Sequence, residues 1–338
     1  MIASPAQTTS PAEPLLAIRD LRVQFHTRHA TLNAVRDLSL TLHPGEIVGL
    51  VGESGCGKSV TAQAILRLIG DNPHEDIQGE ITYQGNNLLD QSEAEMARLR
   101  GRSLAMIFQD PMTALNPVLP VGEQIAEGLR WHLNYSRRAA HQRAIELLGQ
   151  VGISEAARRA RQYPHEFSGG MRQRVVIAIA ISCQPQLLIA DEPTTALDAT
   201  LQSQILDLLL TMRSEAGAAL LLITHDLDVV ANVCDRVAVM YAGTVVESAA
   251  TADLIGSPQH PYTQGLLASI PKLGHKGRLH PIPGQPPDPG TAATGCLFAD
   301  RCPYAHERCQ QTPPRFACSD THHASCWLLD SDSQESSS

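Results

Sequence analysis

The sequence has few aromatic residues and no long uninterrupted hydrophobic run. Aromatic residues make up 4% of the 338 residues, so a core must be filled mainly by Leu, Ile, Val and Ala. No apolar run approaches the roughly 18–20 residues that a membrane-spanning helix needs. The N-terminal stretch lacks a positively charged start followed by an apolar block, so it does not resemble a signal peptide. We therefore expect the chain to stay in the cytosol.

Positive charge is also scarce. Lys and Arg number 26 against 35 Asp and Glu, which gives a formal net charge of −9. This balance argues against a nucleic-acid partner, because binding to nucleic acid depends on cationic contacts to phosphates. It does not exclude a nucleotide ligand, since one phosphate-binding loop can supply local positive potential in an acidic protein.

Composition divides the chain into three parts. Residues 1–14 are rich in Ala, Ser, Thr and Pro and are expected to form a disordered tail. Residues 15–255 alternate between short apolar runs and stretches with helical periodicity, which indicates an α/β fold with helices covering a parallel sheet. The strand candidates are residues 47–51, 187–190 and 220–223, and residues from about 88 to 181 are expected to form a mainly helical insert. Within this insert, residues 137–151 repeat apolar side chains at helical spacing and are expected to form a helix with one apolar face. Residues 256–338 are first Pro-rich and then Cys-rich, which predicts a small C-terminal extension.

A glycine-rich motif follows the first strand candidate. It matches G-x-x-x-x-G-K-[ST] and consists of Gly52, Glu53, Ser54, Gly55, Cys56, Gly57, Lys58 and Ser59. Residues 60–69 then repeat apolar side chains at helical spacing, and Gly70 is expected to end that helix. In such a loop the backbone N–H groups face phosphate oxygens, Lys58 reaches the β- and γ-phosphates, and the Ser59 hydroxyl ligates Mg²⁺. Motif and context together predict a site for ATP and Mg²⁺ rather than an ordinary glycine turn.

Two carboxylates, Asp191 and Glu192, end the strand candidate at residues 187–190. Asp191 is placed to hold Mg²⁺, and Glu192 is placed to polarise an attacking water. Taken alone, the pair fits two solvated strand-end carboxylates equally well.

Five of the eight cysteines gather near the C-terminus: Cys296, Cys302, Cys309, Cys318 and Cys326. Disulfides are rare in a reducing cytosol, so this group indicates a metal site. The spacing C-x5-C-x6-C lacks the close pair that structural zinc prefers and favours an iron–sulfur cluster, expected to be [4Fe–4S]. Zinc, free thiols and a disulfide are the alternatives.

Cys56 of the glycine-rich motif raises a separate question. A helix N-terminus and Lys58 would both lower the pKa of its thiol. A reactive thiol that ATP protects and an inert loop residue are equally favoured interpretations.

Further motifs stand in a fixed order around the phosphate loop. They are Gln109 in Phe108-Gln109-Asp110-Pro111, the segment 167–174 with Ser168, Gly169 and Gly170, the run Ala196-Leu197-Asp198, and His225 in Thr224-His225-Asp226. In this order they resemble the Q-loop, signature motif, D-loop and switch histidine of ABC ATPases. The resemblance covers nearly the whole chain. It implies a RecA-like P-loop NTPase core (residues 15–255) with an antiparallel β part and a helical insert that carries the signature.

The resemblance also implies a role for each motif. Glu192, Gln109 and His225 form the catalytic set, in which Gln109 senses Mg²⁺ and the attacking water and His225 contacts the γ-phosphate. Ser59, Gln109 and Asp191 form the magnesium set. Ser168, Gly169 and Gly170 are expected to cover ATP bound to a second ATPase in a head-to-tail pair. An aromatic residue upstream of the loop stacks on adenine in this family, and Phe25 is the first candidate, with His29 the second.

Four segments resemble the oligopeptide and dipeptide importer branch of the family: residues 110–117, 260–263, 281–284 and 295–303. The resemblance implies an ATP-hydrolysing subunit that powers peptide import. It implies two permeases, a second ABC ATPase in a heterodimer or homodimer, and an extracytoplasmic solute-binding protein. The chain is expected at the cytoplasmic face of the inner membrane as a peripheral subunit.

Nickel, opine and other small-solute importers share this branch and remain alternatives for the transported solute. A soluble ABC ATPase that acts on nucleic acid or ribosomes, and a redox protein regulated by ATP, are the other classes. Within the branch the fourth cluster ligand lies in a Cys-His or Cys-Trp pair near the end. Cys326, which precedes Trp327, is therefore favoured over Cys318, and the expected ligands are Cys296, Cys302, Cys309 and Cys326.

Overall fold

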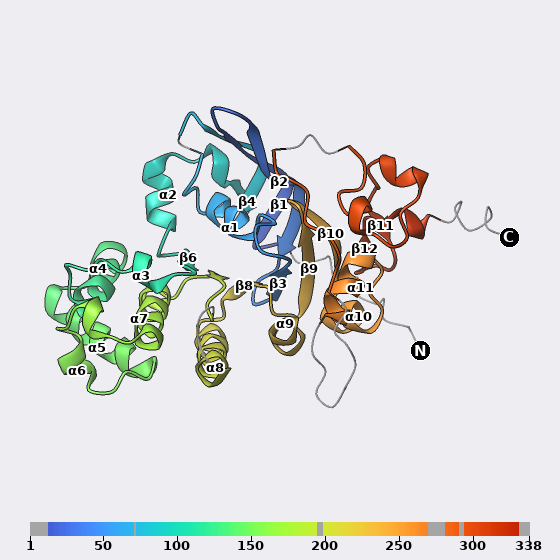
Figure 1. The fold of residues 1–338 in the computed structure, drawn as a ribbon. Coiled ribbons are helices and arrows are strands. Elements are labelled where there is room, and N and C mark those ends of the chain that lie inside the picture. The colour runs from blue at the N-terminus through green and yellow to red at the C-terminus, as the bar shows by residue number, and fades with distance from the viewer. Residues whose placement is uncertain (1–12, 71, 195–198, 270–280, 291–293, 331–338) are drawn as a thin grey trace, which may run out of the picture.

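The computed structural model describes residues 13–70, 72–194, 199–269, 281–290 and 294–330. Most of the tail predicted at residues 1–14 and the run Ala196-Leu197-Asp198 lie outside these ranges. The described chain forms two sheets with helices packed around them, a helical lobe on one side and the C-terminal extension on the other (Figure 1). None of its described helices combines the length and the apolar character needed to cross a membrane.

The larger sheet has eight strands in the order β11-β12-β10-β9-β3-β8-β7-β6. Neighbouring strands from β9 to β6 pair in parallel, whereas β10, β12 and β11 add antiparallel pairs. The three strand candidates are confirmed within it. The strands are β3 (Ile47–Val51), β6 (Leu104–Ile107), β7 (Leu187–Asp191), β8 (Ala219–Thr224), β9 (Arg236–Tyr241), β10 (Thr244–Ala250), β11 (Phe316–Ala317) and β12 (His323–Ala324).

The central strands are buried on both faces. Successive side chains of a strand point to opposite sides, and here the alternation separates two cores. Ile47 and Val51 of β3 join a core with the helical lobe and the C-terminal extension, while Val48 and Leu50 join a core with the smaller sheet. This double burial explains why these strands are continuous apolar runs in the sequence.

The smaller sheet is antiparallel and has the order β2-β1-β4-β5. Its strands are β1 (Leu16–His26), β2 (Thr31–Leu42), β4 (Glu75–Tyr83) and β5 (Asn86–Asn87). Helix α1 (Lys58–Ile65) packs into the same core through Ala62 and Ile65. The prediction that this helix continues to residue 69 is wrong: α1 ends at Ile65, and Arg67 takes the left-handed conformation with φ of 47°.

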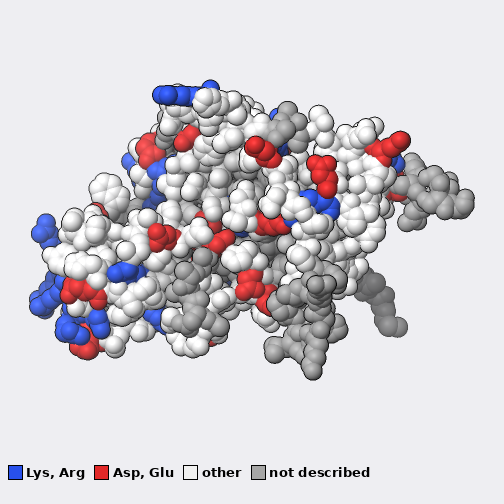
Figure 2. Space-filling model, viewed as in Figure 1, with Lys and Arg blue, Asp and Glu red and all other residues white. Residues whose placement is uncertain are grey.

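The segment predicted as a mainly helical insert contains one core strand. Helix α2 (Glu93–Leu99) comes first, and β6 then joins the larger sheet, so the helical lobe begins only after β6. Its helices are α3 (Pro111–Ala114), α4 (Val121–Leu133), α5 (Arg137–Gln150), α6 (Ala156–Arg159) and α7 (Gly169–Ile181). The apolar face expected on α5 is confirmed, since Ala140, Ala144, Leu147 and Leu148 are buried. Lys and Arg side chains gather over the α4–α6 end in the view of Figure 2, so the overall acidity does not describe every part of the surface.

The remaining helices are α8 (Ala199–Ala216), α9 (Leu227–Val233), α10 (Thr251–Gly256) and α11 (Pro261–Ala268). The C-terminal extension is joined to the core by β12, which pairs antiparallel with β10 through Glu247 opposite Ala324 and Ser248 opposite His323. The extension therefore continues the main sheet, and Figure 1 shows it beside β9 and β10.

Candidate nucleotide site

The glycine-rich motif forms the loop between β3 and α1. A Cβ atom at Gly52 would lie 2.1 Å from the Met240 carbonyl oxygen, and one at Gly57 would lie 2.2 Å from the Ala34 carbonyl oxygen. Gly57 also has φ of 104°, a left-handed conformation that favours glycine. Close packing of the loop against β9 and β2 therefore requires glycine at both positions.

The Lys58 side chain is folded back inside this loop. Its ammonium group donates hydrogen bonds to the carbonyl oxygens of Gly52 at 2.8 Å and Glu53 at 2.9 Å, and the residue is buried. Both oxygen partners are neutral carbonyl groups. The loop thus presents a cation at the N-terminal end of a helix, an arrangement that attracts phosphate.

Ser59 and Asp191 bring two oxygen ligands together. The Ser59 hydroxyl donates to Asp191 Oδ1 at 3.0 Å, across the junction of α1 and the end of β7. Burial raises the pKa of Asp191 above its usual value and Glu192 adds to the rise, while Ser59 and Lys58 act against it. A divalent cation beside these oxygens would favour the ionised carboxylate, so the pair fits a magnesium site.

The three predicted catalytic side chains also meet. Gln109 Nε2 donates to Glu192 Oε2 at 3.0 Å, and His225 Nδ1 lies 3.5 Å from Glu192 Oε1. Glu192 adopts φ of 45°, a strained conformation for a residue with a side chain. Its side chain is 12% exposed, whereas that of His225 is 63% exposed. One carboxylate is therefore held at the end of β7 between a loop amide and an exposed imidazole.

Gln109 and Glu192, but not His225 or Asp191, line a cavity of about 240 Å³ beside the phosphate loop. Its wall includes Phe25, Lys58, Ser59, Gln109 and Glu192. Phe25 thus lies where an adenine ring would meet the β1–β2 side of the site, whereas His29 is exposed and is not among the lining residues. Pro289 of the C-terminal extension also borders this cavity, a contact that the sequence did not predict.

The predicted signature motif, residues 167–174, lies outside this cavity. Ser168 caps α7 by accepting a hydrogen bond from the Met171 N–H at 3.4 Å, and Gly169 begins the helix. None of the described signature residues lines the cavity beside Lys58. Figure 1 shows α7 in the helical lobe, apart from α1. The signature segment and the phosphate loop are therefore two separate elements of the chain.

The structure favours one of the two interpretations of Cys56. The residue is buried, and burial raises the pKa of its thiol although Lys58 acts in the opposite direction. The expectation that Lys58 and the helix end lower this pKa is wrong, because desolvation of the thiolate has the larger effect. Burial and a raised pKa together favour an inert loop residue over a reactive thiol.

The C-terminal cysteines are all reduced thiols, and four of them influence one another. Burial raises the pKa of Cys326 to about 11, and the charges of Cys296, Cys302 and Cys309 contribute to the rise. The pKa of Cys318 is raised by burial and by the charge of Glu247, with no contribution from another cysteine. Among the described residues no three or more His, Cys, Asp or Glu side chains are arranged to hold a metal ion.

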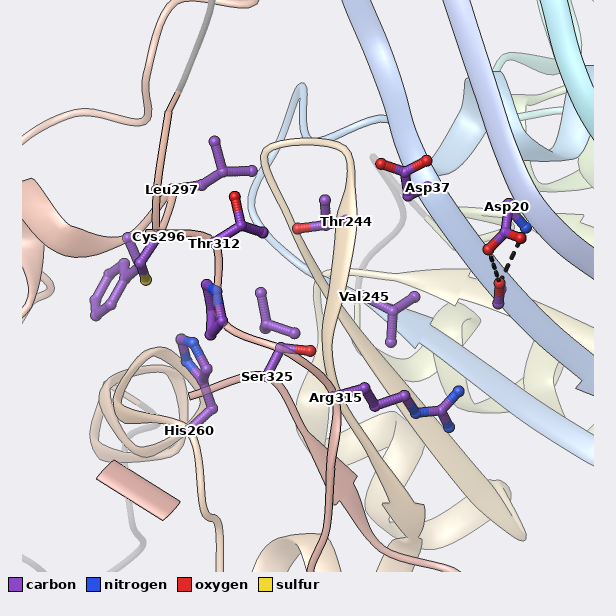
Figure 3. A pocket seen from close by; sticks show the side chains of 15 residues that line it. Asp20, Asp37, Thr244, Val245, His260, Cys296, Leu297, Thr312, Arg315 and Ser325 are labelled. Carbon is purple, nitrogen blue, oxygen red and sulfur yellow. Dashed lines mark hydrogen bonds between the residues drawn. The ribbon is translucent and has the colours of Figure 1, made fainter. Parts of the chain in front are cut away.

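Two cavities border this group of cysteines. One, of about 530 Å³, is lined by Cys296 and Cys309 within the extension. The other, of about 440 Å³, lies between the smaller sheet, β10 and the extension, and Figure 3 shows Cys296 and His260 on one side with Asp20 on the other. Cys296 therefore borders both cavities, whereas Cys302 and Cys326 line neither.

Sequence reasoning missed one contact beside the phosphate loop. Arg301 of the extension forms an ion pair with Glu53, 2.7 Å from Nη1 to Oε2. The only signal was that Arg301 precedes Cys302 in the segment 295–303, and nothing in that pattern names its partner.

Comparison with known proteins agrees with this geometry. Residues 35–195 match the family described as ABC transporter, and residues 246–309 match the oligopeptide/dipeptide transporter, C-terminal region. The chain is 51% identical over 321 residues to the oligopeptide transport ATP-binding protein OppD of Bacillus subtilis, covering 94% of this chain and 90% of that protein. It is 48% identical over 320 residues to the dipeptide transport ATP-binding protein DppD of the same organism, covering 94% and 96%.

A solved structure extends the likeness to the fold. The dimeric post-hydrolysis state of the ATP-binding cassette MJ0796, bound to ADP and Pi, superposes with a TM-score of 0.62 at 27% identity. The match covers 70% of this chain and 98% of that one.

Proposed function

Because this chain belongs to the ATP-binding subunits of the ABC oligopeptide and dipeptide transporters, we propose that it powers the import of di- or oligopeptides. It is an ATPase of the ABC type. The observation that carries the peptide assignment is the C-terminal match at residues 246–309, which distinguishes this branch from other cassettes. Importers of nickel, opines or other small solutes share the branch and form the second candidate.

The geometry supports a role for each residue of the nucleotide site. Lys58 and the N–H groups of the loop bind the β- and γ-phosphates, and Ser59 with Asp191 holds Mg²⁺. That ion would supply positive charge that offsets the negative charge developing during phosphoryl transfer. Glu192 accepts a proton from the attacking water, while Gln109 and His225 orient Glu192 and reach toward the water and the γ-phosphate.

A second ATPase completes the site. ABC ATPases of this family work as dimers with permease partners, and MJ0796 is dimeric in the matched structure. Ser168, Gly169 and Gly170 would cover the ATP bound by the partner ATPase, because the helix N-terminus of α7 presents free N–H groups to an anion. We expect a heterodimer, with a homodimer as the alternative.

The region around Gln109 suits the permeases. Several large apolar side chains are exposed there, and these include Phe108, Met112 and Val118, the last with 73% of its surface exposed. Exposed apolar groups near one another often mark a protein interface. Since Gln109 also contacts Glu192, a permease seated here would be linked to the catalytic carboxylate. Such a subunit would lie peripherally at the cytoplasmic face of the inner membrane and serve an extracytoplasmic solute-binding protein.

The sequence spacing and one cavity support an iron–sulfur cluster in the extension, held by Cys296, Cys302, Cys309 and Cys326. The cavity lined by Cys296 and Cys309 offers room beside these residues. The C-x5-C-x6-C spacing lacks the close pair that structural zinc prefers, so it suits a [4Fe–4S] cluster better than zinc. The cluster would stabilise a Pro-rich segment that has little core of its own.

Reconstitution tests the transport function. The chain is assembled with its permeases, second ATPase and binding protein in proteoliposomes, and ATP turnover is measured with a peptide mixture, with nickel and with opines. Peptide-stimulated turnover that disappears in a Glu192→Gln complex is expected. Stimulation by nickel or an opine alone would replace the peptide assignment with the second candidate.

Anaerobic purification tests the cluster. Iron, sulfide and zinc are measured together with the visible spectrum. We expect iron and sulfide in the native chain and in Cys318→Ser, and their loss in Cys326→Ser. A colourless protein with one zinc and no sulfide would exclude the cluster, and loss of iron only in Cys318→Ser would reassign the fourth ligand.

A further inference from the structure

Glu53, the second residue of the phosphate loop, is held by the C-terminal part of the chain at both its side chain and its backbone. Arg301 donates two parallel hydrogen bonds to its carboxylate, Nη1 to Oε2 at 2.7 Å and Nη2 to Oε1 at 2.9 Å. The Glu53 N–H donates to the Tyr262 hydroxyl of α11 at 3.0 Å. The Glu53 carbonyl oxygen accepts from Lys58. One loop residue therefore connects the extension to the lysine that faces phosphate.

The Arg301 side chain is fixed in place. It is 5% exposed, its Nε donates to the Pro283 carbonyl at 2.8 Å, and its guanidinium lies over the rings of Tyr241 and Phe298 at 5.6 and 5.9 Å. The hydrogen bonding that Arg301 donates to Glu53 is the main cause that raises the pKa of Arg301 above its usual value. A carbonyl group and two aromatic rings hold this buried cation in place. Arg301 therefore keeps its position if the phosphate loop moves, and it gives Glu53 a fixed partner.

The consequence concerns the shape of the loop. A bidentate arginine–carboxylate pair fixes direction as well as distance, because both hydrogen bonds must be satisfied at once. With the carboxylate and the N–H of Glu53 both held, the residue has less freedom to turn its carbonyl oxygen away from Lys58. That oxygen accepts a hydrogen bond from Lys58 and so helps to set the position of its ammonium group before a phosphate binds. Without Arg301, the Glu53 carboxylate, which is 26% exposed, would be hydrated by solvent instead. The loop backbone at Glu53 would then no longer be held through its side chain.

We propose that Arg301 is a positioning residue for ATP binding, which acts through Glu53 to hold the phosphate loop in its binding shape and so ties nucleotide affinity to the docked C-terminal extension. The proposal rests on the assignment of residues 52–59 as the phosphate loop. It does not depend on whether the cysteines hold a cluster.

A matched control lies in the same extension. Arg308 also pairs with a carboxylate, Asp330 at 2.7 Å, and also lies over a ring, that of Trp327 at 4.5 Å. These partners belong to the extension and not to the phosphate loop. Replacing either arginine by Met removes an ion pair and the contact of a guanidinium with aromatic rings, but only Arg301→Met alters Glu53.

The experiment measures affinity for a fluorescent ATP analogue and the thermal midpoint of the full-length chain, and KM and kcat for ATP in the assembled transporter. Arg301→Met should weaken affinity on the order of tenfold, within the usual range of coupling between sites, and raise KM with little change in kcat. Arg308→Met should leave affinity unchanged. Adding Glu53→Gln to Arg301→Met should cost little more, because both changes break the same pair.

Two further variants decide the remaining outcomes. Glu53→Gln alone should weaken ATP binding in the same direction and serves in place of Arg301→Met if that variant does not fold; unchanged affinity in Glu53→Gln overturns the proposal. Equal losses in Arg301→Met and Arg308→Met that follow the thermal midpoint also overturn it, since they indicate a merely structural role. Lys58→Ala distinguishes failure of this proposal from failure of the phosphate-loop assignment on which it rests. If Lys58→Ala still binds ATP, the assignment of the phosphate loop itself fails.

Discussion

The side-chain amide of Gln109 donates a hydrogen bond of 3.0 Å to the carboxylate of Glu192, from the loop after β6 to the end of β7. The two residues are 83 positions apart, and the parallel pairing of β6 with β7 brings them together. The bond leads from the segment expected to face the permeases to the group expected to activate water. Contact with a permease and hydrolysis can therefore influence each other through a single side-chain contact.

Replacing Glu192 by Gln should nearly abolish hydrolysis while ATP still binds. The change removes the proton acceptor but leaves Lys58, Ser59 and Asp191 in place, and loss of a general base typically costs about 10²–10⁴-fold in rate. Turnover and nucleotide affinity are measured in the assembled complex. Lys58→Ala is the control and should weaken binding itself. Substantial turnover by Glu192→Gln would remove Glu192 from the catalytic set.

Replacing Phe25 by Ala should weaken ATP binding about tenfold, the order expected when one aromatic–base stack is lost. Phe25 lines the cavity that contains Lys58, whereas the exposed His29 does not. His29→Ala is therefore the matched control and should bind ATP normally. Phe25 also packs against the core of the smaller sheet, so the thermal midpoint is recorded for both variants. The opposite ranking of the two variants would move the stacking role to His29.

Cys56 should react with maleimide much more slowly than Cys318 in the native protein. Burial raises the pKa of Cys56 and hides its sulfur, whereas Cys318 is exposed. Since the thiolate is the reactive form, both effects slow labelling at Cys56. Mass spectrometry of peptides at successive times gives the two rates. If Cys56 reacts first and ATP slows its reaction, the interpretation as an inert loop residue is wrong.

Acid should destabilise the region around His260. Burial lowers the pKa of His260 from 6.5 to about 4 in the folded protein. A depressed histidine pKa means that the unfolded state binds the proton first, so the stability contribution is complete above pH 6.5 and is lost as the pH falls toward 4. The difference reaches about 2 kcal/mol at pH 5. His260→Asn should keep the cap of α11 without titrating, because Asn also accepts an N–H hydrogen bond at that position. Thermal unfolding of both proteins at pH 5 and pH 7.5 should show a smaller pH effect in the variant, and an equal effect would assign the acid sensitivity to other groups.

The sequence was sufficient for the elements whose signal is local. The apolar runs of β3, β7 and β8 and the glycine loop follow from consecutive residues, and so does the apolar face of α5. The strand β6 was missed because four apolar residues between helical segments carry no period that separates a strand from a helix turn. The early end of α1 was missed because distant groups hold it: Arg100 donates to the carbonyl oxygens of Leu66 at 2.7 Å and of Arg67 at 2.8 Å.

The same reason explains which parts of the site could be predicted. Lys58, Asp191, Glu192, Gln109 and His225 belong to motifs whose spacing is itself the signal. Arg301 and Glu53 are 248 positions apart and belong to no common motif, so only the fold brings them into contact. Cys56 was misjudged because neighbours in sequence suggest a lower pKa, while the burial that raises it is a property of the folded loop.

Replacing Glu247 by Ala should strongly weaken the attachment of the extension to the main sheet. Glu247 lies on β10, its side chain is fully buried, and its carboxylate accepts three hydrogen bonds: from the N–H of Gln259 at 2.7 Å, from the N–H of His260 at 2.9 Å and from His322 Nε2 at 2.7 Å. The carboxylate thus ties the segment before α11 and the loop before β12 to the main sheet. Removing it leaves three buried donors without an acceptor, and breaking a buried pair in this way costs about 3–5 kcal/mol.

Glu146→Ala is the control for the Glu247 variant. Glu146 pairs with Arg143 at 3.1 Å on the exposed side of α5, where an ion pair contributes at most about 1 kcal/mol. Chemical unfolding gives the stability of each variant, and limited proteolysis shows whether the extension separates from the core. We expect a large loss of stability and early cleavage after residue 256 only in Glu247→Ala. Equal stability of the two variants would mean that β12 pairing and the aromatic contacts of Phe298 hold the extension without this carboxylate.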